Sequence, residues 1–270
     1  MRANDVRSTD AVRHGAYVAL RLRPGDAASR AGAGVAALAA RLGLTNEFAA
    51  RDGDPPSAIA FLRRVGAVPG ARDDAALLQA DAVVHVAAAT AAPVDAFCAE
   101  LGRLVGPAAA PRVLGGVVRP TTYTGNAMHN FAYAQRVLQQ PGPVMPNAFL
   151  IPMSKTPEWW AKDWMERHTY FLPRYDDAGR MAAEGHALAA AAGVPCLLRR
   201  TYKHLAEPAP PEAYDFVTYF ECRDADIPTF HAVCAALRDI RRNPEWALVR
   251  EGPTWQGRRV ATWAELLPSA

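Results

Sequence analysis

The order of apolar and polar positions along the chain predicts strands and helices in alternation. Period-two alternation or a short apolar run predicts strands at 15–22, 81–87, 112–119, 147–153, 196–202, 214–221 and 246–250. Apolar residues at helical spacing predict helices at 26–43, 94–105 and 227–240, and a helical region at 157–193 that Pro173 interrupts. The stretch 44–76, where Asp54 precedes two prolines, gives no clear pattern.

Two stretches of the chain follow the same plan. The run DAVVHV leads into the helix VDAFCAELGRL, and YDFVTYF leads into TFHAVCAALRDI. Matching residues recur on one face of each helix: Cys98, Leu101 and Leu104 in the first, Cys234, Leu237 and Ile240 in the second. Each half then has the order strand, helix, strand, strand, helix, strand, which is the ferredoxin-like pattern.

We therefore predict an α+β fold in which two ferredoxin-like repeats form one barrel of the dimeric α+β type within a single chain. Closure into a barrel would leave no exposed sheet edge. The repeats would occupy residues 1–119 and 146–270. The stretch 120–145, rich in Thr, Asn, Gln, Pro and Gly, is the predicted linker.

The amino-acid composition favours a globular protein and disfavours several functional classes. Of the 270 residues, 50% are hydrophobic, which is enough for a sizeable core. The 30 basic and 27 acidic side chains leave a net charge of only +3 without a dense basic cluster, which disfavours a nucleic-acid partner. The four cysteines form no C-x-x-C pair, so neither a zinc site nor a redox motif is indicated.

The start of the chain and its apolar runs bear on where the protein resides. The first residues, MRANDVRSTDAVRHG, are polar and lack the apolar segment of an export signal. No apolar run reaches the roughly 18 residues of a membrane span. We expect a soluble, cytoplasmic protein without a membrane partner.

Seven histidines are present, but no H-E-x-x-H or other two-histidine metal motif occurs, so their number alone selects none of them as a ligand. Five segments in order carry more information: AFLIPMSKTPEWW from Ala148, RMAAEGHAL, LLRRTYKHL, YDFVTYFE and VREGPTWQGRR. A further segment, GGVVRPTTY, ends at Tyr123. In this order and spacing they resemble the chlorite dismutase family of haem b proteins, across residues 112–260.

The resemblance implies a haem b enzyme, a chlorite O2-lyase, in which the second repeat alone, residues 146–270, holds the haem and the first, residues 1–119, holds none. Such an enzyme converts chlorite to chloride and dioxygen through a ferryl haem and a hypochlorite intermediate. It implies that His186 is the iron ligand, because Arg199 follows it by the 13 residues that separate the ligand from the distal arginine in the family. Arg199 would be the catalytic residue. His168, 31 residues before Arg199, is the rival ligand.

The resemblance also assigns further residues to the haem pocket. Thr218 and Phe220 would line the distal face, and Lys155 would belong to a network beside the iron ligand. Trp159, Trp160 and Tyr123 would flank the haem edge and propionates. Strand alternation sends Arg199 and Arg200 to opposite faces, and we expect Arg200 to meet solvent.

The chain departs from the family in three places. In the family a carboxylate holds the proximal histidine, and here it should lie near RRNPEWALVREGP. Glu245 fits that position only with a shifted register, and Arg241 and Arg242 are the alternatives for it. The family's late tryptophan is Glu251 here, and about 12 extra residues follow the tryptophan pair.

Because of these departures, two alternatives to chlorite turnover stay open. One is a peroxidase-like or other small-oxyanion or nitrogen-oxide enzyme of the same fold, and the other is a non-enzymatic haem-binding or sensing protein. The resemblance implies a small anionic substrate and a homo-oligomer, a pentamer.

Overall fold

A computed structural model describes residues 13–23, 25, 30–48, 57–118 and 145–267. The predicted linker at 120–145 lies outside the described residues except for Met145. The first half contains the six main elements of a ferredoxin-like repeat. They are β1 (Arg13–Leu20), α1 (Gly32–Arg41), β3 (Ala58–Val68), β4 (Ala82–Ala88), α3 (Ala91–Val105) and β5 (Arg112–Val118). A short strand β2 (Thr45–Asn46) runs parallel to β3, and α2 (Ala75–Leu78) and a 3-10 turn, η1 (Pro107–Ala109), fill the connections.

The second half repeats this order. Its main elements are β6 (Asn147–Lys155), α7 (Gly185–Ala189), β9 (Leu198–Lys203), β10 (Phe216–Cys222), α8 (Ile227–Arg238) and β12 (Thr254–Val260). Between β6 and α7 lie α5 (Pro157–Trp160), α6 (Trp164–Thr169) and a hairpin of β7 (Arg174–Tyr175) and β8 (Met181–Ala183). The remaining short elements are η3 (Ala191–Gly193), η4 (Asp224–Asp226), η5 (Pro244–Leu248), β11 (Val249–Glu251) and η6 (Trp263–Leu266).

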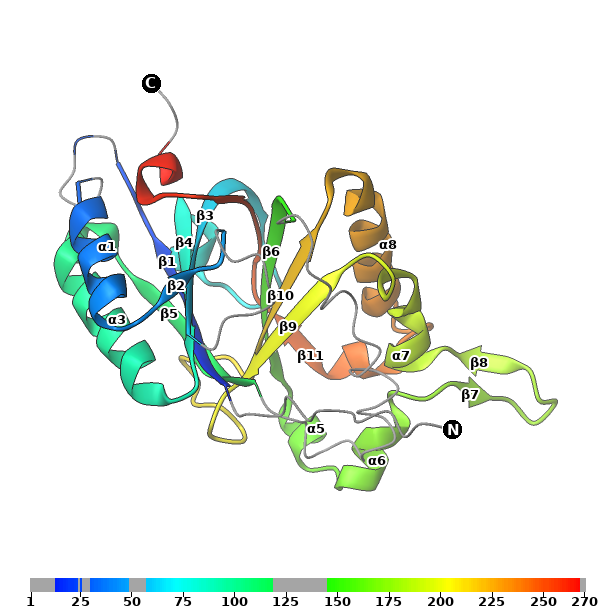
Figure 1. Ribbon diagram of the computed structural model, residues 1–270. Helices are drawn as coiled ribbons and strands as arrows, with labels where there is room; N and C mark the ends of the chain where they lie inside the picture. The colour runs from blue at the N-terminus through cyan, green and yellow to red at the C-terminus, as the bar shows by residue number, and fades with distance from the viewer. Residues whose placement is uncertain (1–12, 24, 26–29, 49–56, 119–144, 268–270) are drawn as a thin grey trace, which may run out of the picture.

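Eight strands close into a barrel. The order within the first half is β5-β1-β4-β3, and β6 of the second half pairs with both β10 and β12. The halves join where β5 meets β9 and where β3 meets β12. Figure 1 shows α1 and α3 on one side of this barrel and α7 and α8 on the other. The prediction of two ferredoxin-like repeats in one α+β barrel is confirmed, and closure leaves these eight strands without a free edge.

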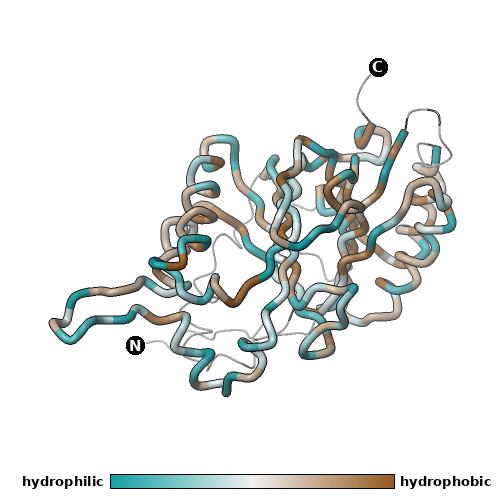
Figure 2. The backbone as a smooth tube through the Cα atoms, turned by 180° about the vertical axis from the view of Figure 1, so that it is seen from behind, coloured by the Kyte–Doolittle hydropathy of each residue, from teal (hydrophilic) through white to brown (hydrophobic). Residues whose placement is uncertain are grey.

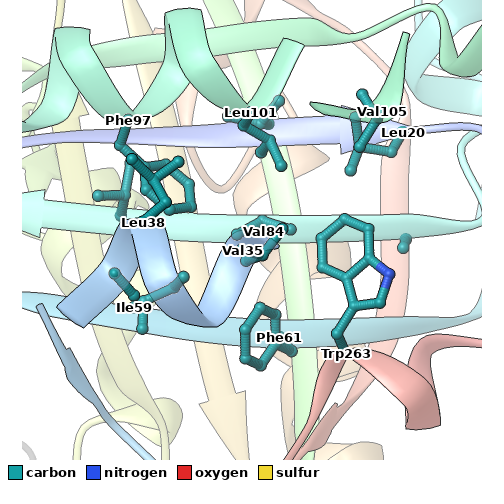
Figure 3. Packing of buried hydrophobic residues seen from close by; sticks show 14 of the residues in the cluster. Leu20, Val35, Leu38, Ile59, Phe61, Val84, Phe97, Leu101, Val105 and Trp263 are labelled. Carbon is teal, nitrogen blue, oxygen red and sulfur yellow. The ribbon is translucent and has the colours of Figure 1, made fainter. Parts of the chain in front are cut away.

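The two repeats cover their strands differently. In the first half, Val35 and Leu38 of α1 and Phe97 and Leu101 of α3 pack tightly on the outer face of β4, around Val84, as Figure 3 shows. In the second half, α7 has only five residues. The outer faces of β9 and β10 are therefore less completely covered, and a cavity remains there.

The region between β6 and α7 is the most irregular part of the described chain. The prediction of a helical region over 157–193 is largely wrong, because only short helices form and the hairpin β7–β8 separates them. Gly185 ends the hairpin region with φ of +70°, a conformation that favours glycine. Figure 2 shows the hairpin projecting from the body with a hydrophilic tip.

Three other local predictions need correction. The strands β3 and β12 were not predicted, although both are central in the sheet. The predicted strand at 246–250 is mostly the 3-10 helix η5, because Pro244 at its start favours a turn. Leu104 is 38% exposed, because the buried face of α3 follows the 3.6-residue period rather than a constant spacing of three, and Ile240 is 57% exposed, because α8 ends at Arg238 before reaching it.

No helix among the described residues is long and apolar enough to cross a membrane.

The packing of α3 yields a stability prediction. Leu101 is fully buried in the first-half core, so Leu101→Ala should lower the free energy of unfolding by about 2 to 5 kcal/mol through lost contacts and a cavity. Leu104→Ala, on the same helix but exposed, should cost much less. Urea unfolding of both variants measures the difference, and equal losses would contradict this account of the core.

Candidate active site

A cavity that is open to solvent lies between the sheet and the helices α7 and α8. The wall is mainly apolar and aromatic with a few charged groups. The lining residues are Ile151, Met153, Lys155, Phe171, His186, Arg199, Thr201, Phe216, Thr218, Phe220, Cys234, Leu237, Arg238, Glu245, Trp246 and Glu251.

His186 is held at the first turn of α7. Its backbone N–H donates to the Tyr170 carbonyl at 3.1 Å, which ties α7 to the end of α6. The preceding Gly185 lies so close to this segment that a Cβ there would meet the Leu172 carbonyl oxygen at 2.3 Å. The backbone around the histidine is therefore fixed by close packing, and glycine is required at that position.

The imidazole of His186 is oriented by a carboxylate. Its Nδ1 lies 2.7 Å from Oε2 of Glu245, so Nδ1 carries the proton and donates to the carboxylate. The other nitrogen, Nε2, is buried and has no hydrogen-bond partner among the described residues. With the proton on Nδ1, Nε2 is the nitrogen that can offer a lone pair to a metal.

The Glu245 carboxylate contacts two partners, His186 through one oxygen and Lys155 through the other. Its second oxygen, Oε1, accepts a hydrogen bond from the Lys155 ammonium, and both side chains are almost completely buried. Burial acts to raise the pKa of the Glu245 carboxyl, but Lys155 and His186 outweigh it and lower that pKa to about 2. The Lys155 nitrogen also lies 4.1 Å from the centre of the Trp159 ring.

The structure selects among the alternatives for the proximal carboxylate. Glu245 is the group beside His186, whereas Arg242 pairs with Glu184 and Arg241 contacts Asp239 near the surface. The sequence did not identify Glu245 as the partner of His186, because the comparison assumed strand register there. The structure instead places Glu245 on the 3-10 helix η5, where strand register does not apply.

The opposite wall of the cavity comes from β9 and β10. Arg199 and Thr201 of β9 lie beside Thr218 and Phe220 of β10, and the two threonine hydroxyl oxygens are 3.3 Å apart. Arg199 is therefore a permanently charged group in a mainly apolar wall. It lines the same cavity as His186.

The expectation that Arg200 meets solvent is wrong. Alternation does place Arg200 on the face opposite Arg199, but that face is the barrel interior, where its side chain lies 3.6 Å from Glu47. Only 8% of Arg200 is exposed. Neither face of β9 is open to bulk solvent: one face lines the cavity beneath the helices, and the other packs in the barrel core.

Other residues singled out from the sequence lie around the cavity rather than in its wall. Trp159 is fully buried behind Lys155 and packs with Phe171 and Phe216, which do line the cavity. Trp160 is partly buried, and its indole N–H donates to Asp215 at 3.4 Å. His168 lies on α6 and does not line the cavity. Tyr123 lies outside the described residues.

Several lining residues were not singled out from the sequence. Ile151 and Met153 share the parity of Lys155 on β6, and Phe216 shares that of Thr218 on β10, so period-two alternation contained the signal. Arg238 and Glu251 form a two-contact ion pair at 2.7 and 2.9 Å beside the cavity. Their pairing depends on the meeting of α8 and β11 and has no signal in the sequence.

The donor set fits a haem better than a bare metal ion. No cluster of three or more His, Cys, Asp or Glu suited to a metal ion occurs in the part of the chain that the structure describes. A haem supplies four nitrogen ligands of its own and needs one axial ligand from the protein, together with an apolar pocket for its ring. His186 Nε2 and the aromatic lining meet both needs.

The state of Glu245 yields a pH prediction. Its folded pKa of about 2 lies below the ordinary value of 4.5, so its stabilising contribution is complete above pH 4.5 and is lost as pH falls toward 2. At pH 7, Glu245→Gln should lower the free energy of unfolding by about 3 to 5 kcal/mol, because Lys155 then keeps a buried charge without its counter-charge. Denaturant unfolding from pH 7 to pH 3 measures both effects.

Between pH 4.5 and pH 3 the wild type should lose more stability than Glu245→Gln, whose side chain does not titrate. Glu166→Gln removes a half-exposed carboxylate on α6 and is the matched control. Parallel pH curves for wild type and Glu245→Gln would contradict the placement of an ionised Glu245 between Lys155 and His186.

Comparison with known proteins was made at the level of sequence and of structure. No family model matches the chain, and no curated protein matches it significantly. Solved structures do match. Chlorite dismutase from Candidatus Nitrospira defluvii in complex with imidazole is 20% identical, with a TM-score of 0.66, over 96% of this chain and 94% of that chain.

A tryptophan-to-phenylalanine variant of the same enzyme, in complex with cyanide, is 19% identical with a TM-score of 0.65, over 96% of this chain and 94% of its own. A candidate chlorite dismutase, TA0507, is 14% identical with a TM-score of 0.58, over 94% of this chain and 97% of its own. At these identities the likeness concerns the fold, and it extends over nearly the whole of each chain. This protein therefore has the fold of the chlorite dismutases.

Proposed function

We propose that the chain binds haem b in this cavity, with Nε2 of His186 as the axial ligand of the iron. The observation that carries the proposal is the buried Nε2, which has no hydrogen-bond partner within the part of the chain that the structure describes, on a ring whose Nδ1 is held by an ionised Glu245. A carboxylate on Nδ1 fixes the tautomer and makes the other nitrogen a stronger donor. The apolar and aromatic lining supplies the surface that a macrocycle buries.

We propose further that the protein is an oxidoreductase that converts chlorite to chloride and dioxygen. The haem, when bound, supplies the redox-active iron for this reaction. Arg199 binds the small anionic substrate, because its guanidinium is always charged and the wall around it is apolar. Phe220 and Thr218 beside it limit the space, so that an anionic fragment stays within the cavity until chloride and dioxygen form.

The assembly is proposed from the resemblance, which implies a homopentamer. Sedimentation of the haem-loaded protein can test this.

Replacement of the ligand tests the haem site. The purified protein, supplied with haem, should show a Soret band, and His186→Ala should abolish or severely weaken haem retention because no other described histidine lines the cavity. The measurement is a spectrophotometric haem titration of wild type, His186→Ala and the control His168→Ala. Full retention by His186→Ala together with loss in His168→Ala would reverse the ligand assignment.

Replacement of the arginine tests the reaction. Arg199→Ala should keep haem but lower the rate of oxygen release from chlorite by about 30- to 1000-fold, on the order of 2 to 4 kcal/mol of transition-state stabilisation. Loss of the cation should also let hypochlorite escape and bleach the haem sooner. Methionine, which scavenges hypochlorite, should therefore prolong the activity of Arg199→Ala more than that of wild type. An oxygen electrode records both effects.

The control for this experiment is Arg241→Ala, since Arg241 has an exposed side chain near the surface. Arg200→Ala is unsuitable because Arg200 is buried beside Glu47 and its loss would disturb the barrel core. Equal oxygen traces for wild type and Arg199→Ala would remove Arg199 from the reaction. A haem-loaded wild type that releases no oxygen from chlorite would favour the peroxidase-like or sensing alternatives instead.

A further inference from the structure

The interior of the barrel holds three tyrosines and a histidine whose rings are in contact. Tyr17 lies 4.7 Å from His85, 5.2 Å from Tyr219 and 5.5 Å from Tyr202, measured between ring centres. All four are buried, with at most 2% exposure. Gly15 makes room for the Tyr202 ring, because a Cβ at that position would lie 2.2 Å from it.

Two of the three phenols are hydrogen-bonded to a group that can take a proton. Nδ1 of His85 faces the Glu47 carboxylate at 3.5 Å. In the neutral ring with its proton on Nδ1, Nε2 of His85 is the acceptor for the Tyr202 hydroxyl, which lies 2.7 Å away. The Tyr219 hydroxyl donates to Glu221 at 2.8 Å. Tyr202, His85 and Glu47 thus form a chain from phenol to base to carboxylate.

This chain has the chemistry of a one-electron donor. A phenol that loses an electron becomes a strong acid, and in a buried site the resulting positive charge is costly unless the proton leaves the ring. A neutral histidine at hydrogen-bond distance can accept that proton. The imidazolium so formed would face Glu47, whose negative charge offsets it.

The cluster lies directly behind the wall of the cavity. On β9, Thr201 lines the cavity and Tyr202 points into the barrel; on β10, Thr218 and Phe220 line the cavity and Tyr219 points into the barrel. Because successive side chains of a strand point to opposite faces of the sheet, neighbours on β9 and on β10 must point to opposite sides. The tyrosines are therefore separated from the proposed haem site by a single layer of sheet.

We propose that Tyr202, with His85 as its proton acceptor, is a redox site that donates one electron to an oxidised haem in the cavity. The proposal rests on the haem binding proposed above. Hydrogen peroxide, the oxidant, would be reduced to water at a haem held by His186, and Tyr202 would supply one of the two electrons that this reduction takes. The O–H bond of Tyr202 breaks, its proton moves to Nε2 of His85, and a neutral phenoxyl radical remains. An external one-electron donor, with the same proton, restores the phenol.

The test is electron paramagnetic resonance of the haem-loaded protein, mixed with hydrogen peroxide and frozen. Wild type should show a radical whose hyperfine structure changes when the protein contains ring-deuterated tyrosine, which separates it from a tryptophan radical. Tyr202→Phe keeps the ring but not the hydroxyl and should lose most of this signal. His85→Gln keeps Tyr202 but removes the base and should also lower the radical yield.

Tyr214→Phe is the matched control, because the Tyr214 hydroxyl donates a hydrogen bond to Asp74 and takes no part in the ring contacts of the three tyrosines and His85. The radical signal of Tyr214→Phe should equal that of wild type. A Soret band and a native circular dichroism spectrum establish that each variant is loaded and folded. A loaded wild type without a tyrosyl signal overturns this inference alone, as does an unchanged signal in Tyr202→Phe or His85→Gln. Loss of the signal in Tyr219→Phe but not in Tyr202→Phe overturns the assignment to Tyr202. A wild type that binds no haem overturns both proposals.

Discussion

The sharing of one buried carboxylate between Lys155 and His186 is the interaction on which the site depends. Glu245 is nearly inaccessible to solvent, and a buried carboxylate without partners would take up a proton. Lys155 keeps it ionised, as the lowered pKa of about 2 reflects. Because it is ionised, it orients the His186 ring and leaves Nε2 free to face the cavity. Three segments distant in the chain, β6, α7 and η5, meet at this one group.

The difference between the two repeats explains why only one has a cavity. Both have the same strand order, and β4 in the first corresponds to β10 in the second. The outer face of β4 carries Val84 and Val86, which the long helices α1 and α3 cover completely. The outer face of β10 carries Thr218 and Phe220, and the short α7 leaves space above them. The short α7 thus accompanies a cavity at the place where the first repeat has a filled core.

The barrel core ties the two repeats together by charge. Glu47 comes from the first repeat and lies 3.6 Å from Arg200 and 3.5 Å from Arg259, both from the second. Arg259 also pairs with Glu221. Burial alone would raise the pKa of Glu47, but these arginines and His85 hold it well below its ordinary value. Buried ion pairs contribute little net stability, so we infer that this network mainly fixes how the two halves are joined.

The sequence by itself determined the repeated α+β plan and part of the cavity wall. Alternation on β9 and β10 places Arg199, Thr218 and Phe220 on faces that follow from local geometry alone, and the order of motifs pointed to His186. It missed β3, where apolar residues give way to arginines partway along the strand, and it predicted a helical region before α7, where the structure has short helices and a hairpin. The tertiary structure decided that Glu245 stands beside His186 and that Arg200 lies inside the barrel. Both depend on contacts between segments far apart in the chain, which periodicity within a single segment does not encode.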